Sequence, residues 1–297
     1  MNVYRIRYKA ISPIHIGFGK RLGIINQTRY FIPATNIWGA ISANLAQRNM
    51  EIIKDYSLIN YQEAQKFIEK NFFITNFYPV IENQVCLPKF KKEGFYYGQY
   101  PKYEFESLIL DSYTSTALQM KTAEEGSLHE IEFLKNKVKG KDLEFEGYIG
   151  IKNDKIKEEH GNVKILYNKN LFFLKEIIKN ISVGGERKYG FGRLSLSSQY
   201  PQQVGDIWKF QIEEDKIIIG ENKTTPFYIN IINNFNKKFI GDIEPIVGRL
   251  WIDDALSGRV GSGQKVGKYG LCIVPGSLVL EEIKIKLNAF GIGFIID

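Results

Sequence analysis

The sequence predicts an α+β fold, because strand-like segments are separated by segments with helical periodicity. Residues 2–11 alternate in character and are rich in Val, Tyr and Ile, which predicts a strand. A helix is expected to start just after Pro33 and to run to about Asn49, and another is expected over residues 168–180. Most of the other patterned segments favour strands.

In the first half of the chain, the first strand leads into a basic loop over residues 14–23 and then a short strand over residues 29–32. The next helix is expected to begin near Thr35 or Asn36. One face of this helix is apolar, with Ile37, Ala40, Ile41 and Leu45. A second helix is predicted over residues 61–70, and strands are predicted over residues 72–81 and 84–87.

Residues 89–105 are aromatic and basic, lack clean periodicity, and are interpreted as an exposed excursion from the core. Four tyrosines in this stretch could stack on nucleic-acid bases or pack as a lid over the sheet: Tyr96, Tyr97, Tyr100 and Tyr103. The lid is the favoured interpretation of the two.

The second half repeats the alternation of strands and helix. Strands are predicted over residues 128–134 and 143–151, joined by a Lys-rich turn. The helix of residues 168–180 is expected to turn four residues inward: Leu171, Leu174, Ile177 and Ile178. Strands over residues 181–183 and 193–197 follow. The combined order suits a βαββαβ ferredoxin-like core with insertions.

A change to polar composition at residues 198–206 predicts a domain boundary. Residues 1–200 would form the ferredoxin-like domain. Residues 201–297 are rich in strand signals and would form a smaller second domain, either β-rich or a divergent ferredoxin-like unit.

Charge is distributed unevenly along the 297 residues, whose net charge is +7. Residues 1–50 contain seven arginines and lysines and no acidic residue, so the remainder sums to zero. Such a positive segment favours a polyanionic partner, RNA or DNA, over a merely solvated basic face. No apolar run is long enough for a membrane span, no signal peptide is apparent, and two distant cysteines favour a reducing cytoplasm.

The stretch of residues 182–196 combines three properties expected of a loop that binds an RNA backbone. Glycines allow positive φ and close approach, basic side chains bind phosphate, and aromatic rings stack on bases. The residues concerned are Gly184, Gly185, Gly190, Gly192, Arg187, Lys188, Arg193, Tyr189 and Phe191. A tight β-hairpin with solvated charges is the alternative.

Two further stretches share this composition. Residues 16–23 contain Gly17, Gly19, Lys20 and Arg21. Residues 257–270 are predicted to form a third glycine-rich basic loop, with Arg259, Lys265 and Lys268 and no acidic residue. Three such stretches strengthen the prediction that the partner is RNA.

Signatures of catalysis, metals and cofactors are mostly missing. None of the three histidines is spaced for metal binding with another histidine or a cysteine, and no phosphate-binding or dinucleotide-binding glycine motif is present. No metal or cofactor is therefore expected. His15 lies beside the first basic loop and could act as a general base on an RNA 2′-hydroxyl. The alternative interpretation of His15 is a strand histidine that is hydrogen-bonded to the backbone.

Three segments together resemble one family. SPIHIGFGK followed by FIPATNIWGAISANL resembles the N-terminal signature of the RAMP superfamily of CRISPR-associated proteins. KTAEEGSLHEIEFL resembles a mid-chain segment of RAMP subunits in type III effector complexes, and GGERKYGFGRL resembles the family's glycine-rich loop. The resemblance implies a ferredoxin-like (RRM-like) core that binds CRISPR RNA within a ribonucleoprotein of antiviral defence. It adds Arg29, Asn36 and Trp38 to the RNA-binding candidates, together with His15.

Within the family, backbone subunits often carry an aspartate in the first basic loop, which cleaves target RNA. Residues 12–31 contain no acidic residue, so this cleavage is not expected here. The resemblance instead favours the single-copy, non-catalytic subunit that binds the 5′ handle of the guide RNA. Its implied partners are CRISPR RNA, other RAMP subunits and the large polymerase/cyclase-type subunit.

Two alternatives stay open. One is a metal-independent endoribonuclease that processes CRISPR transcripts with His15 as base, although its glycine-rich loop would usually lie nearer the C-terminus. The other is a backbone subunit that cleaves target RNA with an acid from elsewhere, such as Asp111 or Asp253.

Overall fold

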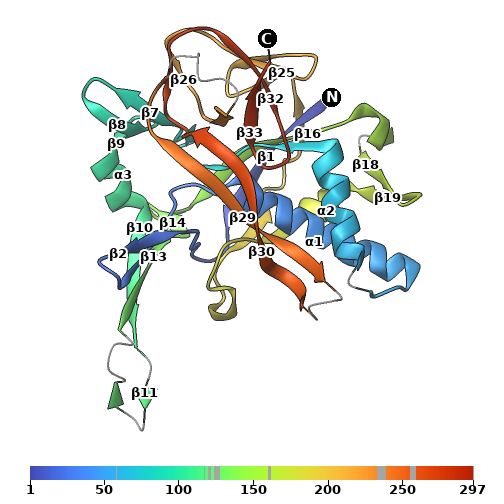
Figure 1. Ribbon diagram of the computed structural model, residues 1–297, viewed down its shortest axis with the longest axis horizontal. Helices are drawn as coiled ribbons and strands as arrows, with labels where there is room; N and C mark the ends of the chain where they lie inside the picture. Colours follow the sequence, from blue (N-terminus) through green and yellow to red (C-terminus); the bar gives the residue numbers. More distant parts are fainter. Residues whose placement is uncertain are drawn as a thin grey trace.

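A computed structural model describes residues 1–57, 59–116, 118–119, 122–123, 128–159, 162–232, 239–254 and 259–296. Its centre is an antiparallel sheet, sheet A, in the order β20-β21-β1-β16-β5-β6. The two middle strands, β1 and β16, are labelled in Figure 1. The strands are β1 (Asn2–Ala10), β5 (Tyr78–Ile81), β6 (Gln84–Val85), β16 (Glu144–Ile151), β20 (Asn180–Ser182) and β21 (Arg193–Leu196). Two more strands join its middle, β4 (Phe72–Ile74) on β16 and β22 (Gln202–Val204) on β1.

Three helices complete the ferredoxin-like arrangement that the sequence predicts. They are α1 (Ala34–Ile53), α2 (Ile59–Asn71) and α4 (Leu174–Ile178). Along the chain, β1, α1, β4 with β5, β16, α4 and β20 with β21 follow the βαββαβ order. The α+β prediction with a ferredoxin-like core is confirmed.

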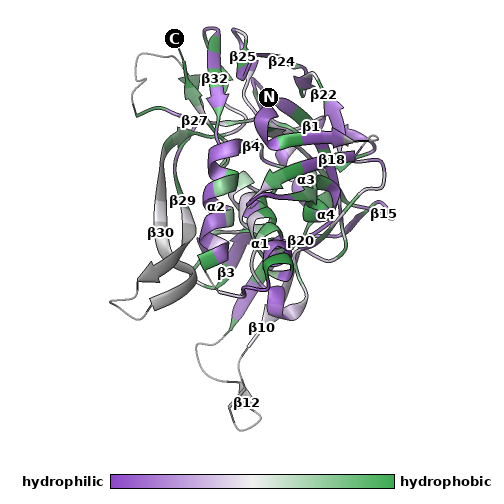
Figure 2. Cartoon of the chain, turned by 90° about the vertical axis from the view of Figure 1, so that its right-hand side faces the viewer, coloured by the Kyte–Doolittle hydropathy of each residue, from purple (hydrophilic) through white to green (hydrophobic). Residues whose placement is uncertain are grey.

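The helices cover one face of sheet A. Ile37, Ile41 and Leu45 of α1 are fully buried, as their spacing predicts, whereas Ala40 is half-buried. Figure 2 shows α1 and α2 with both hydrophobic and hydrophilic residues, as expected for helices buried on one side. Helix α1 runs four residues beyond the predicted end at Asn49, and its C-cap is Lys54 in the left-handed conformation.

The helix predicted over residues 168–180 is wrong in its first half. Residues Asn170–Phe173 form strand β19, which pairs with β18 (Asn162–Tyr167) and, through it, with β17 (Ile156–Glu159). Leu171 is therefore exposed while Phe172 is buried, because neighbouring strand residues point to opposite faces. Leu174, Ile177 and Ile178 are buried as predicted.

A second sheet, sheet B, has the order β10-β13-β3-β2. Its strands are β2 (Gly17–Arg21), β3 (Ile25–Thr28), β10 (Leu110–Ser115) and β13 (His129–Leu134). The basic loop expected over residues 16–23 is thus largely strand β2, with a turn at Leu22 and Gly23. The strand expected over residues 29–32 is wrong apart from one bridge between Ile32 and Phe77. Strand β13 lies in sheet B, away from β16, its successor in the predicted order.

Residues 88–109, called the insert here, form a small sheet and a helix beside sheet B. Their elements are β7 (Pro88–Lys91), β8 (Gly94–Tyr97), β9 (Tyr100–Pro101) and α3 (Lys102–Ile109). Tyr97 and Tyr100 are buried, and the Tyr97 ring stacks on Phe105 at 4.4 Å between centroids. Tyr103 is 76% exposed. Two tyrosines thus pack as the lid interpretation requires, and Tyr103 does not.

Eight strands that follow residue 205 form sheet C, in the order β23-β24-β25-β32-β33-β27-β30-β29. Its strands are β23 (Asp206–Ile207), β24 (Phe210–Glu213), β25 (Lys216–Ile219), β27 (Tyr228–Asn230), β29 (Ile243–Asp254), β30 (Arg259–Ile273), β32 (Ile283–Leu287) and β33 (Ile292–Ile295). The glycine-rich loop predicted over residues 257–270 is wrong, since most of it is β30, paired along its length with β29.

Several short elements complete the described chain. They are β11 (Leu118–Gln119), β12 (Thr122–Ala123), β14 (Lys137–Val138), β15 (Lys141–Asp142), β26 (Lys223–Thr224), β28 (Phe239–Ile240), β31 (Leu278–Val279), and two 3-10 turns at Asn153–Lys155 and Arg187–Tyr189. No helix of the described residues is both long and apolar enough to cross a membrane.

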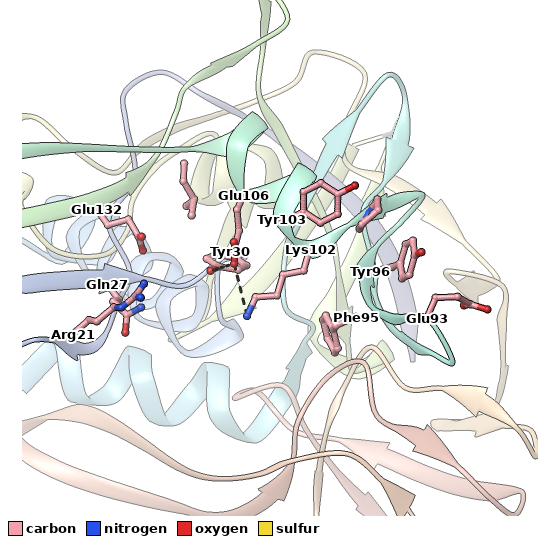
Figure 3. A pocket seen from close by; sticks show the side chains of 12 residues that line it. Arg21, Gln27, Tyr30, Glu93, Phe95, Tyr96, Lys102, Tyr103, Glu106 and Glu132 are labelled. Carbon is pink, nitrogen blue, oxygen red and sulfur yellow. Dashed lines mark hydrogen bonds and ion pairs between the residues drawn. The ribbon is translucent and has the colours of Figure 1, made fainter.

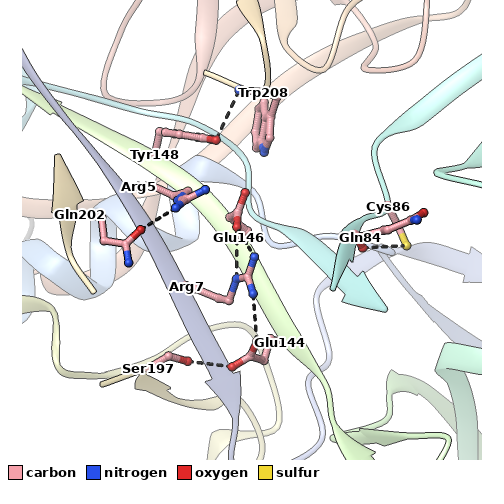
Figure 4. A network of polar contacts seen from close by, with 10 residues as sticks. All are labelled: Arg5, Arg7, Gln84, Cys86, Glu144, Glu146, Tyr148, Ser197, Gln202 and Trp208. Carbon is pink, nitrogen blue, oxygen red and sulfur yellow. Dashed lines mark hydrogen bonds and ion pairs between the residues drawn. The ribbon is translucent and has the colours of Figure 1, made fainter. Parts of the chain in front are cut away.

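Sheet C packs on the face of sheet A that the helices leave open. Val3, Phe73 and Tyr148 share a buried cluster with apolar residues of sheet C, such as Ile229 and Ile285. Trp208 adds to this contact between the two sheets, because its ring packs edge to face on Tyr148 with 5.1 Å between the ring centroids (Figure 4). Sheet A is consequently covered on both faces.

Candidate nucleic-acid interface

The sheet face on which an RRM-like domain stacks RNA bases is closed in this protein. Arg7 lies on this face and donates to Glu146 at 2.6 Å, and Glu146 is 2% exposed (Figure 4). Burial lowers the pKa of Arg7, but Glu146 outweighs it, so the pKa lies above its ordinary value. With Trp208 and sheet C packed above, bases have no access here.

The basic residues of the first fifty are mostly neutralised by acids from distant segments. The pairs are Arg7 with Glu144 and Glu146, Lys9 with Asp142, Arg29 with Glu244, and Arg48 with Glu176. Arg5 donates to Gln202. Among the described residues, Lys20 and Arg21 form no ion pair and are exposed. Gln202 is neutral, so the positive charges of this segment that lack an ion pair among the described residues are those of Arg5, which is half-buried, and of Lys20 and Arg21 on β2.

The glycine-rich loop, residues 183–193, docks directly on the segment before β2. Gly185 N–H donates to the His15 carbonyl at 2.9 Å, and Gly192 N–H donates to the Pro13 carbonyl at 2.8 Å. A Cβ on Gly184 would lie 2.2 Å from the His15 carbonyl oxygen, so only glycine fits. The fold thus brings the loop of residues 182–196 and the segment that leads into residues 16–23 together.

Docking leaves the charged end of the loop in solvent. Arg187, Lys188 and Tyr189 form a 3-10 turn with exposed side chains, and Tyr189 is 75% exposed. Arg193 is exposed too, and its N–H donates to Ser12 Oγ at 3.0 Å. Two cations and a free aromatic ring at one tip suit a phosphate backbone with a stacked base.

Phe191 anchors this loop to sheet B. Its ring meets Phe133 at 5.4 Å and Tyr113 at 5.9 Å, both edge to face. Burial raises the pKa of Tyr113. Phe191 therefore packs within the protein and leaves base stacking to Tyr189. The packing partners Tyr113 and Phe133 had no motif to reveal them, since sheet B joins segments far apart in sequence.

His15 is held in place by its surroundings. It is 8% exposed, and its Nδ1 lies 2.7 Å from the Glu132 carbonyl, to which a protonated Nδ1 donates. Its backbone carbonyl supports Gly185. Gly17 and Gly19 follow in β2 with Lys20 and Arg21, and all four are exposed. His15 thus lies between the two glycine-bearing segments, beneath their exposed charges.

Three other candidates lie elsewhere. Trp38 is 4% exposed, with its ring edge to face against Phe290 at 5.1 Å, so it packs in the core. Asn36 is half-buried in the first turn of α1. Arg29 pairs with Glu244 and donates to the Tyr228 hydroxyl at 3.0 Å, which links β3 to sheet C.

The candidates from residues 257–270 are only partly described. Arg259, Lys265 and Lys268 belong to the backbone of β30, and their side chains lie outside the described residues, as does the side chain of Asp253. Asp111 is exposed in β10, opposite Phe133. In the described part of the chain, no three His, Cys, Asp or Glu residues form a group that could hold a metal ion.

The sequence model of the RAMP superfamily matches residues 7–195. This chain belongs to the RAMP superfamily. The match begins in β1 and ends in β21, so the ferredoxin-like sheet and the docked glycine-rich loop of this RAMP protein both lie inside it.

A solved structure has a similar fold over 93% of this RAMP chain. A chain of the type III-B Cmr-beta complex bound to cognate target RNA and AMPPnP has 13% sequence identity and a TM-score of 0.51, covering 93% of this chain and 85% of that chain. Another structure, type III-B Cmr-beta bound to cognate target RNA, has 14% identity, a TM-score of 0.48, and coverages of 93% and 86%. No curated protein matches. At these identities the likeness concerns the fold.

Proposed function

We propose that this RAMP protein is a non-catalytic subunit of a cytoplasmic type III CRISPR effector complex, in which it binds the 5′ handle of the guide RNA. The observation that carries the proposal is the docked glycine-rich loop. It exposes Arg187, Lys188 and Tyr189 at one tip, while sheet C closes the usual RNA-binding face. The fold likeness to a chain of an RNA-bound type III-B complex supports this class of assembly.

The exposed loop suits a strand of RNA rather than a duplex groove. Phosphates would meet Arg187, Lys188 and Arg193, and one unstacked base would lie on Tyr189. Lys20 and Arg21 on β2 would extend the contact beyond the tip. The partners would be CRISPR RNA, other RAMP subunits and the large polymerase/cyclase-type subunit.

The environment of His15 supports a non-catalytic role. Catalysis on a 2′-hydroxyl needs an imidazole nitrogen within hydrogen-bond reach of RNA. His15 is nearly buried, and one ring nitrogen contacts the Glu132 carbonyl. Repeat RNA incubated with the protein in EDTA should stay intact. Cleavage that disappears in His15→Ala would replace this proposal by the endoribonuclease, and magnesium-dependent target cleavage lost in Asp111→Asn would replace it by the backbone subunit.

Binding is tested with the full chain and a labelled RNA that carries the repeat-derived 5′ handle. The triple variant Arg187→Ala/Lys188→Ala/Arg193→Ala should bind at least tenfold more weakly, since each hydrogen bond to a charged group contributes about 1.5 kcal/mol or more. Its slope of log K against log salt should become shallower by about 2, at roughly 0.7 for each lost phosphate contact. A control with Lys66, Lys70 and Lys169 changed to Ala removes three exposed cations elsewhere. Equal losses in both variants would contradict the loop assignment.

A further inference from the structure

A large cleft opens on the side of the molecule where the β2–β3 hairpin, the insert and sheet C meet. Its main cavity measures about 790 Å³. A second cavity of about 670 Å³ adjoins it and shares Gln27, Tyr30, Phe95 and Lys102 (Figure 3). We call both together the aromatic cleft, because its walls include Phe18, Tyr30, Phe31, Phe90, Phe95 and Tyr97.

Large apolar side chains surround the opening of the aromatic cleft. Phe18 is 53% exposed, Phe90 46%, Ile240 44% and Ile243 54%. They come from four elements, β2, β7, β28 and β29, yet all line the same cavity. Exposed apolar residues scattered singly are normal, but a contiguous patch with a polar surround marks an interaction site.

The charges of the aromatic cleft are unfavourable for phosphate. Arg29 is occupied by Glu244, and Lys102 lies 3.7 Å from Glu106. Three lining carboxylates have no ion pair among the described residues, namely Glu93, Glu132 and Asp242, against one such cation, Arg21. The excess is negative, so a complementary ligand brings cations rather than a polyanionic backbone.

The walls of the aromatic cleft are fixed by packing. Gly276 has a φ of +95°, and a Cβ there would lie 2.6 Å from the Phe95 ring. The Phe90 N–H donates to the Gly276 carbonyl at 3.0 Å, which joins β7 to the turn of sheet C. A preformed cavity loses little conformational entropy when a ligand binds. Burial of its apolar area therefore contributes to affinity.

We propose that the aromatic cleft docks an apolar segment of a neighbouring protein subunit, with Lys or Arg beside the apolar residues. The apolar opening favours a protein segment, and the uncompensated carboxylates select its basic flanks and disfavour RNA. The inference rests on the proposed function only in that the chain works inside a multi-subunit complex. RNA at the tip of the glycine-rich loop and protein in the cleft would then bind at separate sites, and only Arg21 belongs to both.

Site-specific crosslinking tests this assignment in the assembled complex. A Phe90→p-benzoylphenylalanine variant is purified with its partners and irradiated, and the crosslinked peptides are identified by mass spectrometry after nuclease treatment. The same group at Lys66, exposed on α2, is the control. We expect a product with a segment of another subunit in which apolar residues adjoin Lys or Arg. A product with RNA, a product with a second copy of this chain, or a yield no higher than that at Lys66 would each overturn the proposal.

Affinity for that segment, made as a synthetic peptide, gives an independent readout on the full chain. Ile240→Ser/Ile243→Ser should weaken peptide binding at least tenfold, and Asp242→Lys several-fold, whereas Ile52→Ser/Ile59→Ser, also exposed, should not. Undiminished peptide binding by the first variant would refute the inference. Handle-RNA affinity, measured on the same variants, should stay unchanged, which shows that they fold. If the RNA-binding role assigned to the glycine-rich loop were refuted, the result for peptide binding in the aromatic cleft would still hold. The two proposals can therefore be refuted separately.

Discussion

Substitution of Gly192 by alanine should destabilise the protein far more than the same change at Gly190. Both glycines have positive φ, +78° and +88°. A Cβ at residue 192 would lie 1.9 Å from the Val183 carbonyl oxygen, whereas a Cβ at residue 190 meets no atom within 4 Å. Both variants therefore carry the cost of a left-handed backbone, but only the alanine at residue 192 also collides with the Val183 carbonyl oxygen.

The expected magnitude follows from what the collision breaks. Left-handed backbone costs a non-glycine residue about 1 kcal/mol, which applies to both variants. At residue 192 the chain must also move, because a backbone oxygen cannot rotate away. That movement disrupts the hydrogen bonds from Val183 N–H to the Gly192 carbonyl and from Gly192 N–H to the Pro13 carbonyl. Each contributes about 1 kcal/mol, so Gly192→Ala should cost about 3 kcal/mol in total.

Urea unfolding followed by tryptophan fluorescence measures both values under the same conditions. The free energy of unfolding should fall by about 3 kcal/mol in Gly192→Ala and by about 1 kcal/mol in Gly190→Ala. Equal losses in the two variants would refute the claim that close docking of the loop, rather than its turn geometry alone, requires glycine.

Three further predictions concern side chains. Arg29→Ala should lower the free energy of unfolding by roughly 3 kcal/mol, because it leaves Glu244 half-buried without its partner, while handle-RNA affinity in a binding titration stays unchanged; weaker RNA binding without loss of stability would contradict this. Trp38→Ala should lower the free energy of unfolding by about 3–5 kcal/mol through the cavity left beside Phe290, again without a change in RNA affinity; urea unfolding and a filter-binding assay measure the two effects. The hydrogen bond from Lys139, with that from Tyr100, holds the pKa of Glu82 below its ordinary value, so its contribution to stability is present above the ordinary pKa and is lost as pH falls through the lowered one. Urea midpoints measured from about pH 6 to about pH 3 should therefore fall less steeply in Glu82→Gln than in the unmodified protein, and identical slopes would exclude this contribution.

Sequence reasoning succeeded where local periodicity and local sterics decide the structure. β1 and α2 lie within one or two residues of the predicted segments, because alternation and helical spacing are properties of consecutive residues. The helix prediction failed over Asn170–Phe173 because a run of apolar residues fits both periods, and pairing with β18 selected the strand. Residues 257–270 were predicted to be a loop because of their glycines, yet residues 259–270 pair with β29.

In the candidate site too, local features could be predicted from the sequence, and contacts between distant segments could not. The positive φ of Gly184 and Gly192 is a local property, which the composition of the loop indicated, whereas the contact of Gly184 with the His15 carbonyl joins distant segments. The charge of Arg29 is paired with Glu244, which lies far along the chain in sheet C. No count of charges in residues 1–50 could show that pairing. The aromatic cleft likewise joins three distant segments, and only the folded chain brings Phe18, Phe90 and Ile243 together.

Strand β1 is synthesised well before the strands that pair with it. Its neighbours in sheet A are β16, β21 and β22, so residues as late as Val204 must be synthesised before every partner exists. Non-local pairing of this kind slows folding, since loop closure must precede the contacts that reward it. The Pro13 and His15 carbonyls also wait for Gly185 and Gly192. A nascent chain that ends before Gly192 therefore lacks the docked loop, so synthesis of the N-terminal segment precedes formation of the proposed RNA-binding site.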